Sequence, residues 1–245
     1  MADIAIIGGT GLTQLDTLEI VRREVVYTPY GEPSGPVTHG RLDGKDIIFL
    51  ARHGYGHTIP PHKVNYRANI WALRSIGVNR IVAVAAVGGI RNDMKPGSLA
   101  FPDQIIDYTW SRQHTFFEED LEEVTHIDFS YPYSQELRTK LIQAAEAAGI
   151  NVATSGTYGA AQGPRLETAA EIDRMEKDGC DMVGMTGMPE TALARELNLS
   201  YACTAVVANL AAGRGNKSIH EDISENLDRG MQQVWRLLES LVGLL

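Results

Sequence analysis

The chain of 245 residues is 44% hydrophobic and 22% charged, an ordinary composition for one folded domain covering residues 1–245. Its formal charge of -9 argues against a nucleic-acid partner, because phosphate backbones are bound by clustered Lys and Arg. It has two isolated cysteines, no visible export signal and no apolar run long enough to span a membrane, so we expect a cytoplasmic protein without membrane contact.

The first part of the chain alternates short apolar runs with Gly and Pro turns, a pattern typical of antiparallel or meandering strands. We expect strands over residues 4–7, 21–27, 37–42 and 46–51. The first of these runs ends in the glycine-rich turn Gly8-Gly9-Thr10-Gly11.

From residue 64 onward, apolar runs of strand length alternate with segments of helical period, which predicts an α/β fold with a mixed, largely parallel central sheet flanked by helices. The expected strands cover 80–87, 151–160, 181–183 and 201–208. The expected helices cover 64–76 and 134–148, one that opens at the capping box Thr168-x-x-Glu171, one with Pro189 in its first turn, and a terminal one that opens at Ser218-x-x-Glu221. Because the run 80–87 has almost no polar residue, we expect it to be covered on both faces.

The segment 103–133 stands apart from this alternation. It combines aromatic side chains with an acidic cluster at 118–123 and has no regular pattern of its own. A long irregular aromatic segment predicts a lid or a contact between subunits.

Residues suited to an anion follow three of the predicted strands. The turn at residues 8–11 offers backbone N–H groups and the Thr10 hydroxyl. Arg52 and His53 offer a bidentate guanidinium and an imidazole donor. Thr186 precedes an expected helix, whose N-terminus favours negative charge.

Each of these three motifs also has a plainer interpretation, namely a tight turn, a surface salt bridge and a helix N-cap. A dinucleotide site at the first turn is excluded, because position 14 is Gln where the fingerprint requires Gly. Ligands of open α/β sheets gather where strands end, so the three motifs together favour one phosphate site.

The histidines at 53, 57 and 62 raise the possibility of a zinc site. Histidine ligands at such spacing normally share a helix face, whereas the glycines and prolines between residues 54 and 61 exclude a helix here. We therefore expect no metal and no organic cofactor.

Two polar side chains could select a heterocyclic base. Asn209 is the first strongly polar residue after the apolar run 201–208, and its carboxamide offers an acceptor and two donors, as a purine edge does. Glu167 stands just before a capping box, so its carboxylate either points into the same crevice or only favours the helix dipole.

Taken together, these motifs resemble the methylthioadenosine and purine nucleoside phosphorylases, the trimeric nucleoside phosphorylase family. The resemblance covers nearly the whole chain. Its most specific parts are IGGTGL at 7–12, RHGYGHTIPPHKVNYRANIWAL at 52–73, GPRLETAAE at 163–171 and MTGMPE at 185–190. It implies a single-domain α/β fold, a homotrimer, and phosphorolysis of a purine nucleoside with inorganic phosphate as co-substrate.

The resemblance also implies roles for individual residues. The expected phosphate ligands are Thr10, Arg52, His53 and Thr186, with the backbone at Ala85 and Ala86 beside them. The expected nucleoside contacts are Met185 at the ribose, Glu167, Asn209 and Ala211 at the purine, His126 reaching a neighbouring subunit's 5′ pocket, and His220 near the 5′ substituent. Asn209 and His53 are the expected catalytic residues.

Departures from the family pattern narrow the expected substrate. Methylthioadenosine-specific members carry Asp at both 209 and 211 and a Ser-type residue at 167, whereas this chain has Asn209, Ala211 and Glu167. Glu167 can accept the N1–H of a 6-oxopurine and Asn209 can donate to O6, while adenine reverses both polarities at a cost of about 1–3 kcal/mol per mismatch. Tyr55, where purine nucleoside phosphorylases have Arg, favours the methylthio branch. We therefore expect phosphorolysis of a 6-oxopurine 5′-methylthio-nucleoside.

Four alternatives remain open at this point. Two keep the reaction but change the nucleoside, to methylthioadenosine or to inosine and guanosine. A hydrolase would use water on the same nucleosides, and a binding module would have no catalysis. Turnover with and without phosphate separates the last two from a phosphorylase.

Overall fold

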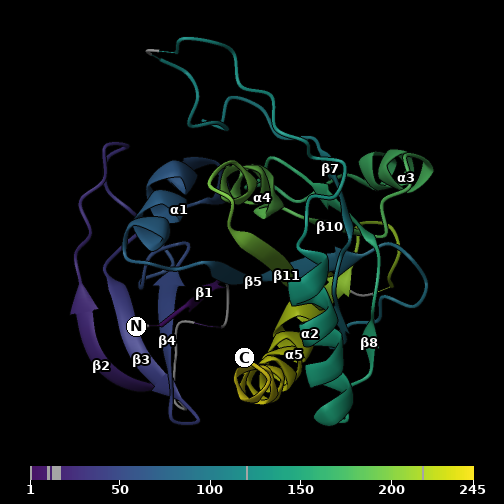
Figure 1. The fold of residues 1–245 in the computed structure, drawn as a ribbon. Coiled ribbons are helices and arrows are strands. Elements are labelled where there is room, and N and C mark those ends of the chain that lie inside the picture. The colour runs from purple at the N-terminus through teal and green to yellow at the C-terminus, as the bar shows by residue number, and fades with distance from the viewer. Residues whose placement is uncertain (1, 10–11, 13–17, 120, 217) are drawn as a thin grey trace.

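One mixed β-sheet of 11 strands runs through the protein, with helices on both of its faces (Figure 1). The computed structural model describes residues 2–9, 12, 18–119, 121–216 and 218–245. The predicted α/β class with a mixed central sheet is confirmed.

The predicted meander is formed by β2 (Glu19–Glu24), β3 (Val37–Leu42) and β4 (Lys45–Ala51), which pair antiparallel in chain order. β1 (Ile4–Gly8) lies parallel to β4 and joins this meander to the rest of the sheet. The prediction for the second strand was wrong at both ends. β3 begins at Val37, which pairs with Glu24, so residues 25–27 have no partner to extend β2.

The centre of the sheet is β5 (Arg80–Gly89), which β11 (Ser200–Leu210) accompanies in parallel along one edge from end to end. Two different strands pair with the other edge of β5. β1 pairs with residues 80–83, and the antiparallel strand β10 (Met182–Gly184) pairs with Gly88 and Gly89. Residues 84–87 lie between these two neighbours, so their backbone faces a gap in the sheet.

Beyond β10 the sheet continues through β9 (Thr157–Ala160) to β7 (Gln104–Asp107), all parallel to one another. The short strands β6 (Leu99–Ala100) and β8 (Val152–Ala153) form a branch beside β11. The single strand predicted over 151–160 is therefore two strands, because β8 pairs with β6 whereas β9 pairs with β7 and β10.

Each face of the sheet has its own pair of helices. α1 (Tyr66–Ser75) and α4 (Gly187–Glu196) lie on one face, and α2 (Gln135–Ala147) and α5 (Ile219–Gly243) pack together on the other (Figure 1). Alternate residues of a strand serve the two faces: Ala5 and Ile7 belong to the first core, and Ile4 and Ile6 to the second. The sheet is thus covered on both faces, as the apolar run 80–87 predicted.

The remaining helices are α3 (Ala169–Lys177) and the 3-10 turn Pro61–Lys63. Both predicted capping boxes are confirmed, at Thr168 for α3 and at Ser218 for α5. The chain between β7 and α2 rises away from the body of the molecule (Figure 1). Among the described helices, none is long and apolar enough to cross a membrane.

Candidate active site

A cavity of about 520 Å³ opens at the gap beside β5, within the size range of small-ligand sites. Ala85, Ala86 and Gly88 of β5 line it. The carboxyl ends of the parallel strands β4, β5 and β11 meet there, and an open α/β sheet binds ligands at such a point.

Nine of the residues predicted from the sequence line this one cavity, although they come from five separate parts of the chain. They are Arg52, His53, Ala85, Ala86, Glu167, Met185, Thr186, Asn209 and Ala211. Thr10 lies outside the described residues. The adjacent Gly9 lines the cavity, with room for hydrogen only: a Cβ there would lie 2.9 Å from the Val84 carbonyl oxygen and 3.0 Å from Nη1 of Arg52.

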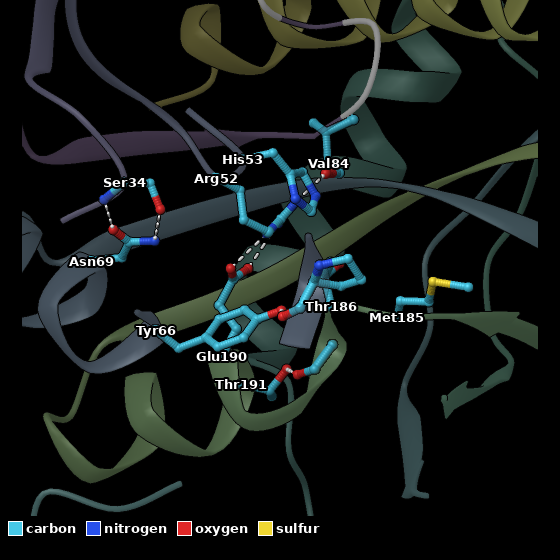
Figure 2. A network of polar contacts seen from close by, with 12 residues as sticks. Ser34, Arg52, His53, Tyr66, Asn69, Val84, Met185, Thr186, Glu190 and Thr191 are labelled. Atoms are coloured by element: carbon cyan, nitrogen blue, oxygen red, sulfur yellow. Dashed lines mark hydrogen bonds and ion pairs between the residues drawn. The ribbon is translucent and has the colours of Figure 1, made fainter. Parts of the chain in front are cut away.

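Arg52 is held by a buried carboxylate that the sequence analysis did not identify. Its Nε and Nη2 donate to the two carboxylate oxygens of Glu190 at 2.7 and 2.8 Å, and Nη1 donates to the Val84 carbonyl oxygen at 2.9 Å (Figure 2). Arg52 is 1% exposed and Glu190 0%. Three of the five N–H groups of the guanidinium are thus engaged, and two remain for an anion.

Glu190 has a second partner, because the Tyr201 hydroxyl donates to it at 2.8 Å. Burial opposes the charge on Arg52, but the facing carboxylate raises its pKa, so the guanidinium is charged. The only signal for Glu190 in the sequence was its place in MTGMPE at the start of a helix. Its partner lies 138 residues away, and no local pattern reveals that distance.

His53 has a fixed tautomer. Its Nδ1 lies 2.8 Å from the Ile59 carbonyl oxygen, which can only accept, so Nδ1 carries a proton. Burial, and then the charge of Arg52, lower the pKa of His53 to about 4. At neutral pH the ring is therefore neutral with a lone pair on Nε2. The contact of His53 with phosphate stays a prediction: with a neutral ring, a phosphate oxygen that hydrogen-bonds to Nε2 must bring the proton.

This neutral histidine predicts a loss of stability in mild acid. The unfolded state takes up a proton below a pKa of about 6.5 while the folded state resists until about 4, so stability falls as pH drops through this window. Between pH 7 and pH 5 the contribution is about 2 kcal/mol. Chemical denaturation at both pH values should show a smaller difference for His53→Asn, whose amide can still donate to Ile59. An equal pH dependence in variant and wild type would refute this assignment.

Thr186 stands at the N-terminus of α4, but its hydroxyl does not cap the helix. Its backbone N–H donates to the Tyr158 hydroxyl at 3.3 Å. Met188 has extended angles (φ -117°, ψ 140°), so the regular helix begins at Pro189, in agreement with its predicted place. The simple N-cap interpretation of Thr186 is thus wrong, and its side chain lines the cavity beside Arg52 and His53.

Glu167, which also lines the cavity, is half-buried, and burial raises the pKa of its carboxyl group. Among the described residues, no other side chain forms a hydrogen bond with its carboxylate. The Glu171 carboxylate, by contrast, accepts hydrogen bonds from the backbone N–H of Thr168 in the capping box and from the Arg165 guanidinium. The Glu167 carboxylate can therefore still accept a hydrogen bond from a ligand. Glu171, not Glu167, caps the N-terminus of α3.

Asn209 is aimed by an irregularity in β11. The pairing of β11 with β5 shifts register between Val207 and Asn209, and such a bulge redirects a side chain. Its Nδ2 donates to the Leu210 carbonyl oxygen at 2.7 Å, so one hydrogen is left for a ligand. Gly88 makes room for it, since a Cβ there would lie 3.3 Å from Nδ2.

The two remaining predicted histidines do not line the cavity of this chain. His220 is exposed, because α5 instead presents Ile219, Ile223 and Leu227, spaced one turn apart, to the cavity. His126 is exposed on the segment that rises from the body, and its predicted contact with a neighbouring subunit stays a prediction. The cavity is thus lined by apolar side chains where α5 meets it, and the place of His220 near the 5′ substituent stays a prediction.

The three histidines considered for zinc do not form a metal cluster. The rings of His53 and His57 lie 4.8 Å apart between centroids, and Nδ1 of His62 is buried without a partner. Across the described part of the chain, no group of three or more His, Cys, Asp or Glu could hold a metal ion.

Comparison with known proteins identifies the family. A family model described as "Phosphorylase superfamily" matches residues 3–243. A "Probable S-methyl-5'-thioinosine phosphorylase" of Pseudomonas syringae is 57% identical over 96% of each chain, and a "6-oxopurine nucleoside phosphorylase" of Pyrococcus furiosus is 47% identical over 100% of this chain and 94% of its own. The solved methylthioadenosine phosphorylase of Schistosoma mansoni in complex with adenine superposes with a TM-score of 0.93 at 33% identity, over 100% of this chain and 92% of that one. The chain therefore belongs to the phosphorylase superfamily.

Proposed function

We propose that the protein cleaves S-methyl-5′-thioinosine with inorganic phosphate, releasing hypoxanthine and 5-methylthioribose 1-phosphate. The observation that carries the proposal is the polarity of one cavity. Groups suited to an anion (Arg52, His53 and Thr186) line it together with a carboxylate that has no side-chain partner among the described residues and a carboxamide with one hydrogen left to donate (Glu167 and Asn209).

The base is recognised by hydrogen-bond polarity. The Glu167 carboxylate accepts the N1–H of a 6-oxopurine, and the free Nδ2 hydrogen of Asn209 donates to the oxygen or N7 side of the ring. Adenine presents an acceptor to Glu167, which would leave a half-buried carboxylate unpaired. The name of the Pseudomonas syringae relative supports the same choice of base.

The 5′ substituent is selected by apolar contact. Ile219, Ile223 and Leu227 line the cavity from α5, and a thioether packs against such a wall whereas a hydroxyl would lose its hydrogen bonds there. The exposed position of His220 removes the side chain that would have favoured inosine.

The reaction requires no protein nucleophile. As the C1′–N9 bond breaks, its electron pair moves to the purine and positive charge develops on the sugar, while a phosphate oxygen forms the new bond to C1′. Arg52 and Thr186 hold the phosphate on the attacking side, and Asn209 stabilises electron density on the departing base. The neutral His53 accepts a hydrogen bond at Nε2 from a protonated phosphate oxygen, which orients the phosphate beside C1′.

The proposal is tested by base release from S-methyl-5′-thioinosine with and without phosphate. We expect hypoxanthine to appear only with phosphate, in equal amount to the sugar phosphate, and inosine to be cleaved with a kcat/KM at least about 10-fold lower. Release without phosphate would indicate a hydrolase. No release from any nucleoside would indicate a binding module.

We also propose that the protein assembles as a homotrimer through the segment between β7 and α2. Four large hydrophobic residues of this segment are exposed, namely Trp110, Leu121, Val124 and Tyr131. Such a concentration of apolar side chains is typical of a protein contact. Light scattering should give three times the chain mass, and a monomer would contradict the proposal.

A further inference from the structure

Arg112 is a buried cation without a carboxylate partner in the described part of the chain. It is 8% exposed and lies in the segment between β7 and α2, outside all helices and strands. Its guanidinium makes hydrogen bonds in every direction. Nη1 donates to the carbonyl oxygens of Met185 at 2.8 Å and Met188 at 2.6 Å, and Nη2 to that of Gln162 at 2.7 Å and, more weakly, to that of Ala161 at 3.3 Å.

The Nε donor of Arg112 and the face of its guanidinium also have partners. Nε lies 3.2 Å from Oε1 of Gln162, which accepts the backbone N–H of Trp110 as well. The guanidinium carbon lies 5.6 Å from the centre of the Tyr66 ring, whose hydroxyl is 3.4 Å from Nη1. All five N–H groups therefore have acceptors, and this rigid fork cannot be reproduced by an ammonium group.

The acceptors belong to two turns that carry different groups of the candidate site. Met185 and Met188 flank Thr186, the hydroxyl at the phosphate end. Ala161 and Gln162 end the strand region from which the chain runs on to Glu167, the carboxylate at the base end. The Arg112 side chain thus connects the turn that carries Thr186 with the turn that leads to Glu167.

We propose that Arg112 is a positioning residue, which sets the separation between the Thr186 turn and the Glu167 turn so that phosphate and purine are bound in register for displacement. This inference rests on the proposed function. Because Arg112 belongs to the segment between β7 and α2, this segment would help to shape the active site of the same chain. Misplacement of reacting groups by about 1 Å can cost about 100-fold in rate.

Arg138 offers a matched control. It is 4% exposed, and its guanidinium donates to the carbonyl oxygens of Pro102, Phe101 and Thr154, but it lies on α2 and none of these acceptors lines the cavity, whereas Met185 does. Arg112→Lys and Arg138→Lys therefore each remove a buried guanidinium that donates to backbone carbonyl oxygens. The first does so next to the candidate site and the second away from it.

The two variants are compared by steady-state kinetics and by the rise in Tm that phosphate alone produces. We expect Arg112→Lys to lower kcat by about 100-fold, to raise KM for phosphate and to lose most of the phosphate-induced rise in Tm. Arg138→Lys should keep wild-type kcat and KM and the full rise, even where its own Tm is lower. Equal kinetic losses in both variants, or wild-type kinetics in Arg112→Lys, would overturn the proposal.

A milder variant keeps the test decisive where Arg112→Lys does not fold. Gln162→Met removes the Oε1 acceptor that Nε of Arg112 shares with the backbone N–H of Trp110, and leaves the four carbonyl contacts of the guanidinium in place. It should lower kcat in the same direction by a smaller factor; unchanged kcat and KM would count against the proposal. Wild-type turnover of S-methyl-5′-thioinosine decides the proposed function separately, because the variant comparison uses whichever nucleoside the wild type cleaves and the Tm measurement needs none.

Discussion

Glu190→Gln should lower the free energy of unfolding by about 3–5 kcal/mol, the largest effect that we expect from a single substitution in this protein. The substitution keeps the shape of the side chain but removes its charge. Arg52, 1% exposed, would then be buried with no counter-charge, and only one of its two hydrogen bonds to residue 190 could remain. Denaturant unfolding of the variant and the wild type measures the difference.

A double variant distinguishes the effect of the Arg52–Glu190 ion pair on stability from its effect on phosphorolysis. Arg52→Met with Glu190→Leu replaces the ion pair by apolar side chains, so it should recover most of the stability lost in Glu190→Gln. It should still lose phosphorolysis by at least about 100-fold, because the guanidinium that faces the phosphate is gone. A loss of less than about 1 kcal/mol in Glu190→Gln would mean that this pair is not a buried ion pair.

Asn209→Asp should shift the ratio of kcat/KM for S-methyl-5′-thioinosine over S-methyl-5′-thioadenosine by at least about 100-fold toward the adenine nucleoside. Asp has no donor for a 6-oxo group but accepts from a 6-amino group. It also cannot donate to the Leu210 carbonyl oxygen, so its carboxylate turns from that contact toward the base. Steady-state kinetics on both nucleosides measure the ratio.

Asn69→Asp is the control for this substitution. Asn69 is 0% exposed and forms two hydrogen bonds with Ser34 outside the cavity (Figure 2). Its replacement changes a buried amide to a carboxylate without touching the base, so selectivity should stay at the wild-type value. Unchanged selectivity in Asn209→Asp would reject the assignment of Asn209 to the base.

Much of the fold could be predicted from the sequence, because local patterns determine it. Apolar runs bounded by Gly and Pro gave the strands, and the capping boxes at Thr168 and Ser218 gave the first residues of two helices. The boundaries of β2 could not be predicted: it is an exposed edge strand, and only the start of β3 decides where its pairing ends. The gap beside β5 depends on which strands share an edge, which no local pattern contains.

The candidate site was predictable where its residues follow strands, and less so where they depend on distant partners. Glu190 holds Arg52, which lies 138 residues away along the chain, and the acceptors of the Arg112 guanidinium lie at least 46 residues away, so no local pattern reveals either set of contacts. The place expected for His220 near the 5′ substituent stays a prediction, although its exposed side chain does not line the cavity. Since the capping box fixes where α5 begins, the apolar spacing of Ile219, Ile223 and Leu227 could have identified the face that turns to the cavity.

The central claim is that Glu167 and Asn209 select a 6-oxopurine. Its most direct test is the ratio of kcat/KM for S-methyl-5′-thioinosine over S-methyl-5′-thioadenosine in the wild-type protein at saturating phosphate. We predict a preference of at least about 100-fold for the inosine nucleoside, because adenine mismatches both side chains. Equal rates, or faster cleavage of the adenine nucleoside, would contradict the claim.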